Sequence, residues 1–310
     1  MSGRRPAPVV APLLLATAAW GLGTVISRRA VLEIPPLTLL VVQLGASAVV
    51  LGLVLLAQGR LGAVRGVPRG LRWLGIVNPG LGYGLGLLGL ASISASLAVL
   101  LWAIEPLFIL VLAAVFLRER IGPRFVALSL VALVGMVLVV YEPGAGGELI
   151  GIVLTVAGVA CCAAYTVASR RWLGADAAAP VVFAQQGVAL VGGILAVAIV
   201  GALGGELLPA DASAIGWASA LASGVLYYAA AYVLYLSALR TMPAATAATS
   251  FYLIPVFGIA GSITLLGERL SPIQWLGAAI SLVAVYLLLR RPQPDAVPEA
   301  TAGAVAERVA

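Results

Sequence analysis

A charged heptapeptide ends an apolar segment twice in this chain: it reads LRERIGP at residues 117–123 and LGERLSP at residues 266–272. Five of the seven positions agree in residue type, and the two copies are 149 residues apart. Upstream of them, Pro106 falls on Pro255 at the same offset. A repeat of this length predicts that the chain is built from two structurally related halves.

A second match lies near the start of each half, at a slightly different offset. Residues 27–29 (Ser-Arg-Arg) correspond to residues 169–171, and Gln43 falls on Gln185, both 142 residues apart. An insertion of seven residues between the seventh and eighth apolar segments reconciles the two offsets. The halves are therefore predicted at 9–141 and 149–290. The tail at 292–310 has the Ala, Pro and Glu content of a disordered segment, which is expected to be cytoplasmic.

Composition predicts that both halves lie in a membrane. The chain is 62% hydrophobic and only 10% charged, whereas soluble domains carry about 25% charged residues. Charge-free windows long enough for a transmembrane helix of about 20 residues follow one another along the chain. The longest apolar stretch contains a single charge, Glu105, and a polar break divides it into two spans. This gives ten expected spans near 9–27, 36–57, 72–90, 96–117, 124–141, 149–169, 180–201, 214–239, 244–266 and 272–290.

The spans are predicted to be helices, because each span in lipid must satisfy its own backbone hydrogen bonds. Five spans per half is an odd number, so the second half enters the membrane from the opposite side, as an inverted repeat. With the N-terminus inside, only Arg28, Arg29 and Arg269 of the 18 arginines fall outside. The positive-inside rule then predicts that both ends are cytoplasmic. The expected fold is an all-α integral membrane protein of ten transmembrane helices, arranged as two inverted five-helix repeats.

These residues also carry a family resemblance. An apolar helix, a proline, further apolar residues, Leu-x-Glu-Arg-(Leu/Ile)-x-Pro and a Gly/Ala-rich helix follow in that order in both halves. This pattern resembles the EamA repeat of the drug/metabolite transporter superfamily, over residues 9–290. The first copy departs from it at Arg118, where glycine is usual, and at Glu105, before its proline. The resemblance implies a ten-helix secondary transporter, similar within the superfamily to the YddG-type bacterial amino-acid exporters.

Polar and aromatic residues recur at equivalent depths in the two halves, as expected for a cavity lined from both sides of a repeat interface. At the offset of 149, Tyr83 corresponds to Tyr232 and Trp102 to Phe251. The candidate substrate-binding residues are Trp20, Gln43, Asn78, Tyr83, Trp102, Glu105, Tyr165, Gln185, Tyr228, Tyr232 and Phe251.

Packing is the alternative interpretation for the aromatic residues, and hydrogen bonding between helices is the favoured interpretation for Gln43 and Gln185. Prolines remove backbone hydrogen bonds and glycines allow bending, so they mark candidate hinges, with static kinks as the alternative. The candidate hinge or gating residues are Pro79, Gly80, Pro106 and Pro255.

Glu105 is the single carboxylate inside a long apolar segment, and its counterpart in the second half is Ile254. A charge at bilayer depth costs at least about 2.5–3.5 kcal/mol, so this side chain is expected to face protein or water. Two interpretations stay open: Glu105 exchanges a proton during transport, or it is a neutral structural acid bonded to the kink of its own span. Glu119 and Arg120, at the end of that span, are expected to have a structural role, such as an ion pair between helices.

Residue types exclude several classes of function. The chain has no histidine and no lysine, which removes histidine catalysis and the lysine of an ATP-binding P-loop. We therefore expect no enzyme, cofactor, metal site or nucleic-acid partner. The predicted function is a monomeric secondary transporter in a bacterial-type inner membrane. It is expected to export small metabolites, above all neutral or aromatic amino acids, by alternating access. A multidrug or other metabolite carrier is the alternative.

Overall fold

The structure, a computed structural model of the chain, describes residues 7–90, 92–93, 101–102, 104–140, 148–173, 177–205, 207, 212–261, 263–264 and 271–290. Every regular element within these residues is a helix. Up to residue 140 these are α1 (Ala7–Val31), α2 (Pro36–Ala57), η1 (Leu61–Gly66), α3 (Arg69–Gly75), η2 (Ile76–Leu81), α4 (Gly82–Leu90), α6 (Glu105–Phe116) and α7 (Pro123–Val140). They are followed by α8 (Leu149–Trp172), α9 (Ala178–Ala202), α10 (Ala214–Ser223), η3 (Gly224–Ala230), α11 (Ala231–Leu239), α12 (Ala244–Ala248), η4 (Thr249–Leu253), α13 (Ile254–Gly261) and α14 (Pro272–Arg290).

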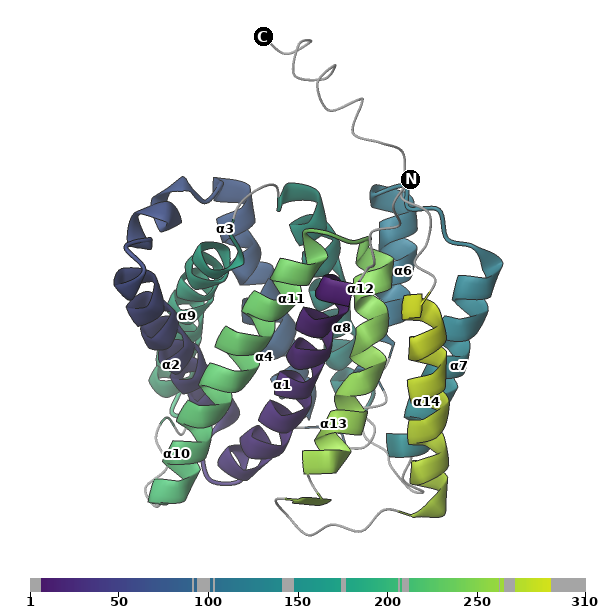
Figure 1. Cartoon of the computed structure of the whole chain (residues 1–310). Helices are drawn as coiled ribbons and strands as arrows, with labels where there is room; N and C mark the ends of the chain where they lie inside the picture. The colour runs from purple at the N-terminus through teal and green to yellow at the C-terminus, as the bar shows by residue number, and fades with distance from the viewer. Residues whose placement is uncertain are drawn as a thin grey trace.

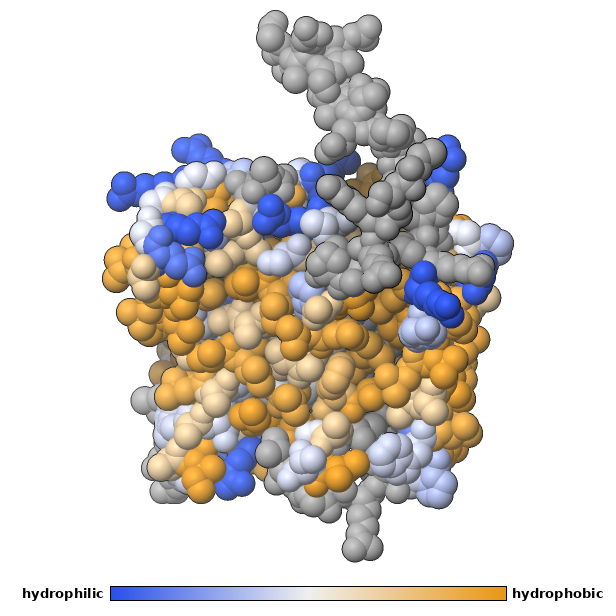
Figure 2. Space-filling model, in the orientation of Figure 1, coloured by the Kyte–Doolittle hydropathy of each residue, from blue (hydrophilic) through white to orange (hydrophobic). Residues whose placement is uncertain are grey.

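Six helices of the described chain are long and apolar enough to cross a membrane, judged by length and composition: α1, α2, α8, α9, the continuous α10–α11 and α14. Figure 2 shows an apolar band across the face in view, with polar residues towards both ends. The helical prediction is therefore confirmed. The other expected spans consist of shorter helices, such as Glu105–Phe116 and Ala244–Gly258, so the count of ten stays a prediction. The tail at 292–310 and residues 266–270 of the second heptapeptide lie outside the described residues.

Two helices form the centre of the bundle. α1 packs against α10, α11 and α13, and α8 packs against α4 and α6. In Figure 1, α2 and α9 lie together on one side of these two helices, and α7 and α14 lie together on the other. The interior of the bundle is therefore bounded mainly by α1, α4, α6, α8, α10–α11 and α12–α13.

Glycines allow the closest approach of helices at two corresponding crossings. A Cβ atom on Gly224, at the start of η3, would lie 2.6 Å from the carbonyl oxygen of Gln43 in α2. A Cβ atom on Gly75, at the end of α3, would overlap the carbonyl oxygen of Gln185 in α9. The glycines are 149 residues apart and the glutamines 142, so the two crossings follow the two sequence offsets.

The α10 helix begins with a hydrogen-bonded cap at the end of the bundle opposite the arginine-rich loops. The Ser213 hydroxyl accepts a hydrogen bond from the Gly216 amide at 3.0 Å. The Ser213 amide in turn donates to Glu33 Oε2 at 2.7 Å. Hydrogen bonds from the side chain and from the amide of Ser213 to Glu33 lower the pKa of Glu33 below its ordinary value, because they favour the ionised form.

The two glycine crossings provide a test of the packing. We expect Gly75→Ala and Gly224→Ala each to lower the unfolding free energy by about 1–3 kcal/mol, because the added methyl group meets backbone that cannot move aside. The matched control is Gly45→Ala in α2, where a Cβ atom has no neighbour within 4 Å. This control should be neutral or slightly stabilising. Thermal unfolding of the purified variants in detergent, followed by tryptophan fluorescence, measures the difference. Equal stability of all three variants would contradict the close helix approach at Gly75 and Gly224.

Candidate functional site

Two spans depart from a regular α-helix at corresponding positions in the middle of the bundle. η3 (Gly224–Ala230) is π-helical, and an offset of 149 residues superimposes η2 (Ile76–Leu81) on it. η2 is a kink, in which Pro79 lacks an amide proton and Asn78 is extended, with φ −151° and ψ 128°. Irregular turns such as that of η3 are frequent at functional sites, because they point side chains in directions that a regular α-helix does not allow.

Three tyrosine hydroxyl groups lie together next to η2 and η3. The hydroxyl of Tyr232 lies 3.2 Å from that of Tyr83 and 3.2 Å from Asn78 Oδ1. The hydroxyl of Tyr227 donates to that of Tyr83, also at 3.2 Å. Tyr227 and Tyr232 are five residues apart, the spacing of the i→i+5 hydrogen bond that defines a π-helix, and both hydroxyls reach the same partner. Tyr83 and Tyr232 occupy equivalent positions of the two sequence copies and are in direct contact.

Trp20 of α1 lies at the centre of a second group of rings. Its ring centroid lies 5.5 Å from that of Tyr232, 5.3 Å from that of Tyr235 and 5.3 Å from that of Phe251, all in edge-on geometry. Such contacts contribute about 0.5–1.5 kcal/mol beyond area burial. All four side chains are buried. The contact between Trp20 and Phe251 joins residues from opposite ends of the sequence.

Trp102 covers the hydroxyl cluster from one side. Its ring stacks on Tyr83 with centroids 5.7 Å apart and 23° between the planes. Gly86 of α4 makes room for it, because a Cβ atom there would lie 2.8 Å from the Trp102 ring. Tyr228 meets Tyr83 edge-on at 5.7 Å. Tyr83 and Trp102 are only half-buried, whereas Tyr228 is fully buried.

Glu105 is the first residue of α6 and is half-buried. Within the described part of the chain, no donor or arginine pairs with its carboxylate. The start of a helix carries a positive partial charge that favours a carboxylate there, and Ile104, the residue before it, supplies no side-chain cap. Glu105 interacts electrostatically with the hydroxyls of Tyr227 and Tyr235 and with the Cys162 thiol. The carboxylate is therefore within electrostatic range of these tyrosines, which together with Tyr83, Tyr228 and Tyr232 we call the tyrosine cluster.

The glutamines bond to neighbouring helices. Gln43 Nε2 lies 2.8 Å from the hydroxyl oxygens of both Ser27 and Ser223. Gln185 Nε2 donates to the carbonyl of Leu71 at 2.9 Å, and Gln185 Oε1 accepts from the Tyr165 hydroxyl at 2.8 Å. These bonds are the interhelical role that the sequence favours for Gln43 and Gln185. Tyr165 also links two helices, because its hydroxyl donates to Gln185.

The candidate hinges all lie at changes of helix type. Pro79 and Gly80 are inside η2. Pro106 is the second residue of α6 and Pro255 the second residue of α13, which follows the 3₁₀ segment η4. A proline in the first turn of a helix costs no hydrogen bond. Pro106 therefore lies in the first turn of α6 and does not interrupt it. Pro255 lies inside the continuous helical segment Ala244–Gly258, where the 3₁₀ turn of η4 changes to α13.

Two tyrosines of these aromatic groups, Tyr227 and Tyr235, are absent from the candidates chosen from the sequence. Tyr235 shares a helical face with Tyr228 and Tyr232, which was a usable signal. Tyr227 corresponds to Asn78 at the offset of 149, but its position beside Tyr228 places it on another face of a regular α-helix. The π-helical turn of η3 brings it to Tyr83, and sequence periodicity does not reveal that turn.

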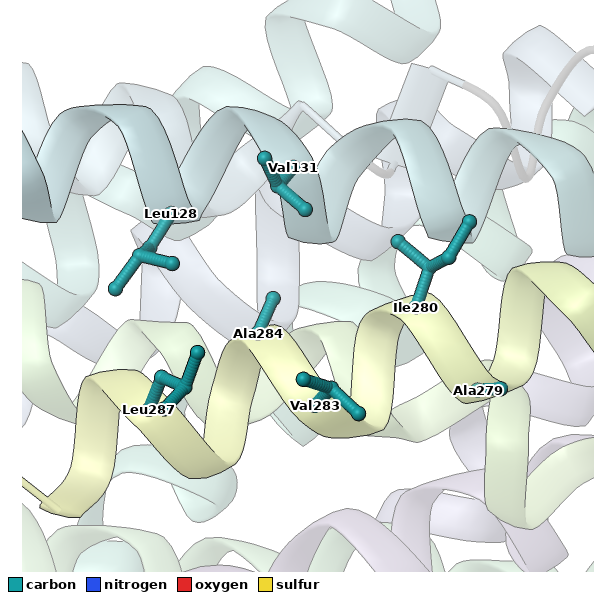
Figure 3. A pocket seen from close by; sticks show the side chains of 7 residues that line it. All are labelled: Leu128, Val131, Ala279, Ile280, Val283, Ala284 and Leu287. Carbon is teal, nitrogen blue, oxygen red and sulfur yellow. The ribbon is translucent and has the colours of Figure 1, made fainter.

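A shallow apolar groove of about 320 Å³ lies elsewhere, on the outer side of the α7–α14 pair (Figure 3). It is lined by Leu128, Val131, Ala279, Ile280, Val283, Ala284 and Leu287. Val131 and Val283 are exposed there. Because the lining offers no polar side chain, the groove has no chemistry comparable to that of the tyrosine cluster.

Comparisons with known proteins agree with this architecture. A family model described as "EamA-like transporter family" matches residues 8–141 and 149–290. A probable terminal-alkyne amino-acid exporter of Streptantibioticus cattleyicolor is 28% identical over 207 residues, which are 66% of this chain and 67% of that protein. An uncharacterized transporter of Synechocystis sp. is 35% identical over 80 residues, 25% of this chain and 24% of that protein. A solved structure described only as "Crystal structure of protein" is similar with a TM-score of 0.77 at 20% identity, covering 93% of this chain and 100% of the other. That likeness concerns the fold alone.

The hydroxyl cluster provides a second test. We expect Tyr232→Phe to lower the unfolding free energy by about 1 kcal/mol, because Asn78 and Tyr83 each lose a buried hydrogen-bond partner. Tyr286→Phe on α14 is the matched control, since 59% of that side chain is exposed. Unfolding with sodium dodecyl sulfate in mixed micelles measures both variants. If the two variants are equally stable, the hydroxyl contacts of Tyr232 do not contribute to the fold.

Proposed function

The chain belongs to the EamA-like transporter family, and on that premise we propose that it exports neutral and aromatic amino acids by alternating access. It is a multi-pass membrane protein. In this proposal, it acts as a monomer in a bacterial-type inner membrane, with both termini in the cytoplasm. Its halves, 9–141 and 149–290, form two inverted five-helix repeats.

Reciprocal contacts support the repeat. Each half supplies the partner of the equivalent contact in the other: Gly224 meets Gln43, and Gly75 meets Gln185. Pairs 149 residues apart also touch directly. The Ser281 hydroxyl donates to the carbonyl of Ala132 at 3.1 Å. The hydroxyls of Tyr83 and Tyr232, which are also 149 residues apart, are in contact as well. Such self-matching pairs are expected along a pseudo-two-fold axis.

One observation carries the substrate proposal: aromatic rings and hydroxyls from both halves meet, and the Glu105 carboxylate, which has no partner within the described residues, is within electrostatic range of them. Neutral amino acids carry an ammonium group, a carboxylate and an apolar or aromatic side chain. Glu105 supplies the negative charge for the ammonium group. Trp102 and Tyr83 present ring surfaces, which attract cations and pack against apolar side chains.

The relatives favour this substrate class over others. The Streptantibioticus cattleyicolor protein carries the name of an amino-acid exporter. A carrier of other metabolites or of drugs remains the alternative, because aromatic surfaces accept many apolar cations.

Two coupling schemes differ in the role of Glu105. In the first, Glu105 binds a proton in one conformation and releases it in the other. In the second, transport is facilitated diffusion or exchange, and Glu105 binds only the substrate. A charged group at bilayer depth suits either scheme.

Transport in proteoliposomes tests the function. We expect saturable uptake of radiolabelled neutral and aromatic amino acids, with stimulation by the same amino acid on the opposite side of the membrane. A passive channel gives no such counterflow. Equal transport of unrelated organic cations would instead support a multidrug carrier. The panel is measured with and without a pH gradient, so that it also separates proton coupling from exchange.

Glu105→Gln tests the binding role. We expect this variant to raise the KM for neutral amino acids about tenfold, because a hydrogen bond to a charged group contributes about 1.5–3 kcal/mol and tenfold corresponds to 1.4 kcal/mol. Glu148→Gln is the control, because Glu148 is exposed before α8 and supplies no side-chain cap to it. Unchanged KM in Glu105→Gln would exclude the ammonium contact. Unchanged dependence on the pH gradient would exclude the proton role.

A further inference from the structure

The carboxylate of the first heptapeptide binds a helix of the opposite half. Glu119 Oε1 accepts a hydrogen bond from the Ala244 amide at 2.7 Å, and Glu119 Oε2 accepts one from the Ala245 amide at 3.1 Å. These amides begin α12, and the preceding Pro243 supplies no side-chain cap. Both alanines are buried. We call this pair of hydrogen bonds the Glu119 clasp. It is a structural contact between helices, and the ion pair expected from the sequence stays a prediction.

The chain turns sharply to form the clasp. Arg118 has a φ of 54°, a left-handed conformation that glycine adopts more easily. Because of this turn, the Glu119 amide donates back to the carbonyl of Ala113 at 3.2 Å, and the side chain points to α12. The usual glycine of the family pattern fits the same conformation, although this copy carries arginine.

The end of α8 holds the same region together. Arg170 Nε donates to the carbonyl of Met242 at 2.9 Å, in the loop that leads into α12. Arg171 donates to the carbonyl of Phe116, the last residue of α6, at 3.4 Å. The clasp and these two arginines thus tie α6, α8 and α12 together at the arginine-rich end of the bundle.

The helix that Glu119 binds leads to one of the buried aromatic rings. α12 continues into η4, which carries Phe251, and Phe251 packs on Trp20 and Tyr235 with centroids 5.3 and 5.0 Å away. These three rings are buried, whereas Tyr83, Trp102 and Glu105 are half-buried. A movement of α12 away from α6 would carry Phe251 away from Trp20 and Tyr235.

Two buried polar atoms in this region lack partners. Trp20 Nε1 and Thr246 Oγ1 are among the buried side-chain atoms that have no hydrogen-bond partner within the described part of the chain. Their residues are 5% and 3% exposed. Buried polar atoms normally have partners, so an unpaired one requires an explanation. Trp20 lies on α1 against Phe251, and Thr246 lies on α12, the helix that would move away from α6.

We propose that Glu119 is a positioning residue for transport: its hydrogen bonds to α12 hold the arginine-rich end closed, and their release opens a path from the tyrosine cluster to that end. The inference rests on the proposed transport function, but it concerns the conformational equilibrium and not the substrate. When the path opens, Trp20 Nε1 and Thr246 Oγ1 gain water or substrate as partners.

Cysteine accessibility tests the clasp without any substrate. The reporter is Thr246→Cys in a Cys161→Ser, Cys162→Ala background, labelled by the membrane-permeant N-ethylmaleimide in proteoliposomes. We expect slow labelling of this reporter, and a rate about tenfold higher when Glu119→Gln is added. Tenfold corresponds to a shift of about 1.4 kcal/mol towards the open state. Because the reagent crosses the membrane, the result does not depend on orientation.

Two controls separate opening from general loosening. Glu33→Gln removes a carboxylate-to-amide hydrogen bond at the opposite end of the bundle, and it should leave the labelling rate at Thr246→Cys unchanged. A second reporter, Ser281→Cys, is buried between α7 and α14, and its rate should stay low in Glu119→Gln.

Three outcomes would overturn the proposal: an unchanged rate at Thr246→Cys, an equal rise at Ser281→Cys, or an equal effect of Glu33→Gln. If Glu119→Gln does not accumulate in the membrane, Arg170→Gln removes the hydrogen bond to Met242 and must raise the same rate by a smaller factor. Failure of amino-acid transport in the panel leaves the labelling prediction intact, so the two proposals fail separately.

Discussion

Inside a membrane, every backbone amide and carbonyl must find a partner within the protein, and this chain meets that demand at its helix breaks with side chains from distant segments. Gln185 donates to the carbonyl of Leu71 just before η2, and Gln186 donates to the carbonyl of Tyr228 inside η3 at 2.6 Å. Glu119 accepts from the first amides of α12. Each break is therefore stabilised by a segment more than 40 residues away in sequence, so the breaks exist only in the assembled bundle.

The breaks also create the candidate site. A regular α-helix presents about one residue in every 3.6 to a given neighbour, which separates Tyr227 from the face of Tyr228 and Tyr232. The π-helical turn of η3 lets Tyr227 and Tyr232 reach the Tyr83 hydroxyl together. The same polar groups that a membrane helix would avoid are thus gathered in one place, where the hydroxyls of Tyr227 and Tyr232 both lie within hydrogen-bond distance of the Tyr83 hydroxyl. A regular α-helix in place of η3 would separate Tyr227 from the Tyr83 hydroxyl.

Symmetry explains the scaffold better than it explains the chemistry. Tyr83 meets its own counterpart Tyr232, and Pro106 and Pro255 are each the second residue of an α-helical segment. Glu105, in contrast, corresponds to Ile254, so the carboxylate is an addition to one half only. The repeated residues shape the helices and their crossings. The selectivity of the site is expected to depend on the residues that break the symmetry, because Glu105 gives the site a charge that its counterpart Ile254 does not supply.

The sequence by itself determined the helical membrane-embedded character, the family and most of the cluster, because charge-free runs of about 20 residues have few stable solutions in lipid and the repeat pairs Tyr83 with Tyr232. Gln43 and Gln185 could also be assigned to helix packing from residue type. Only the tertiary structure decided the role of Tyr227 and the partner of Glu119. The first amide that binds Glu119, that of Ala244, lies 125 residues away in the sequence. Periodicity reports which face of a regular helix is apolar, whereas the position of a helix break, and the side chain that satisfies it, depend on contacts between segments that the sequence keeps far apart.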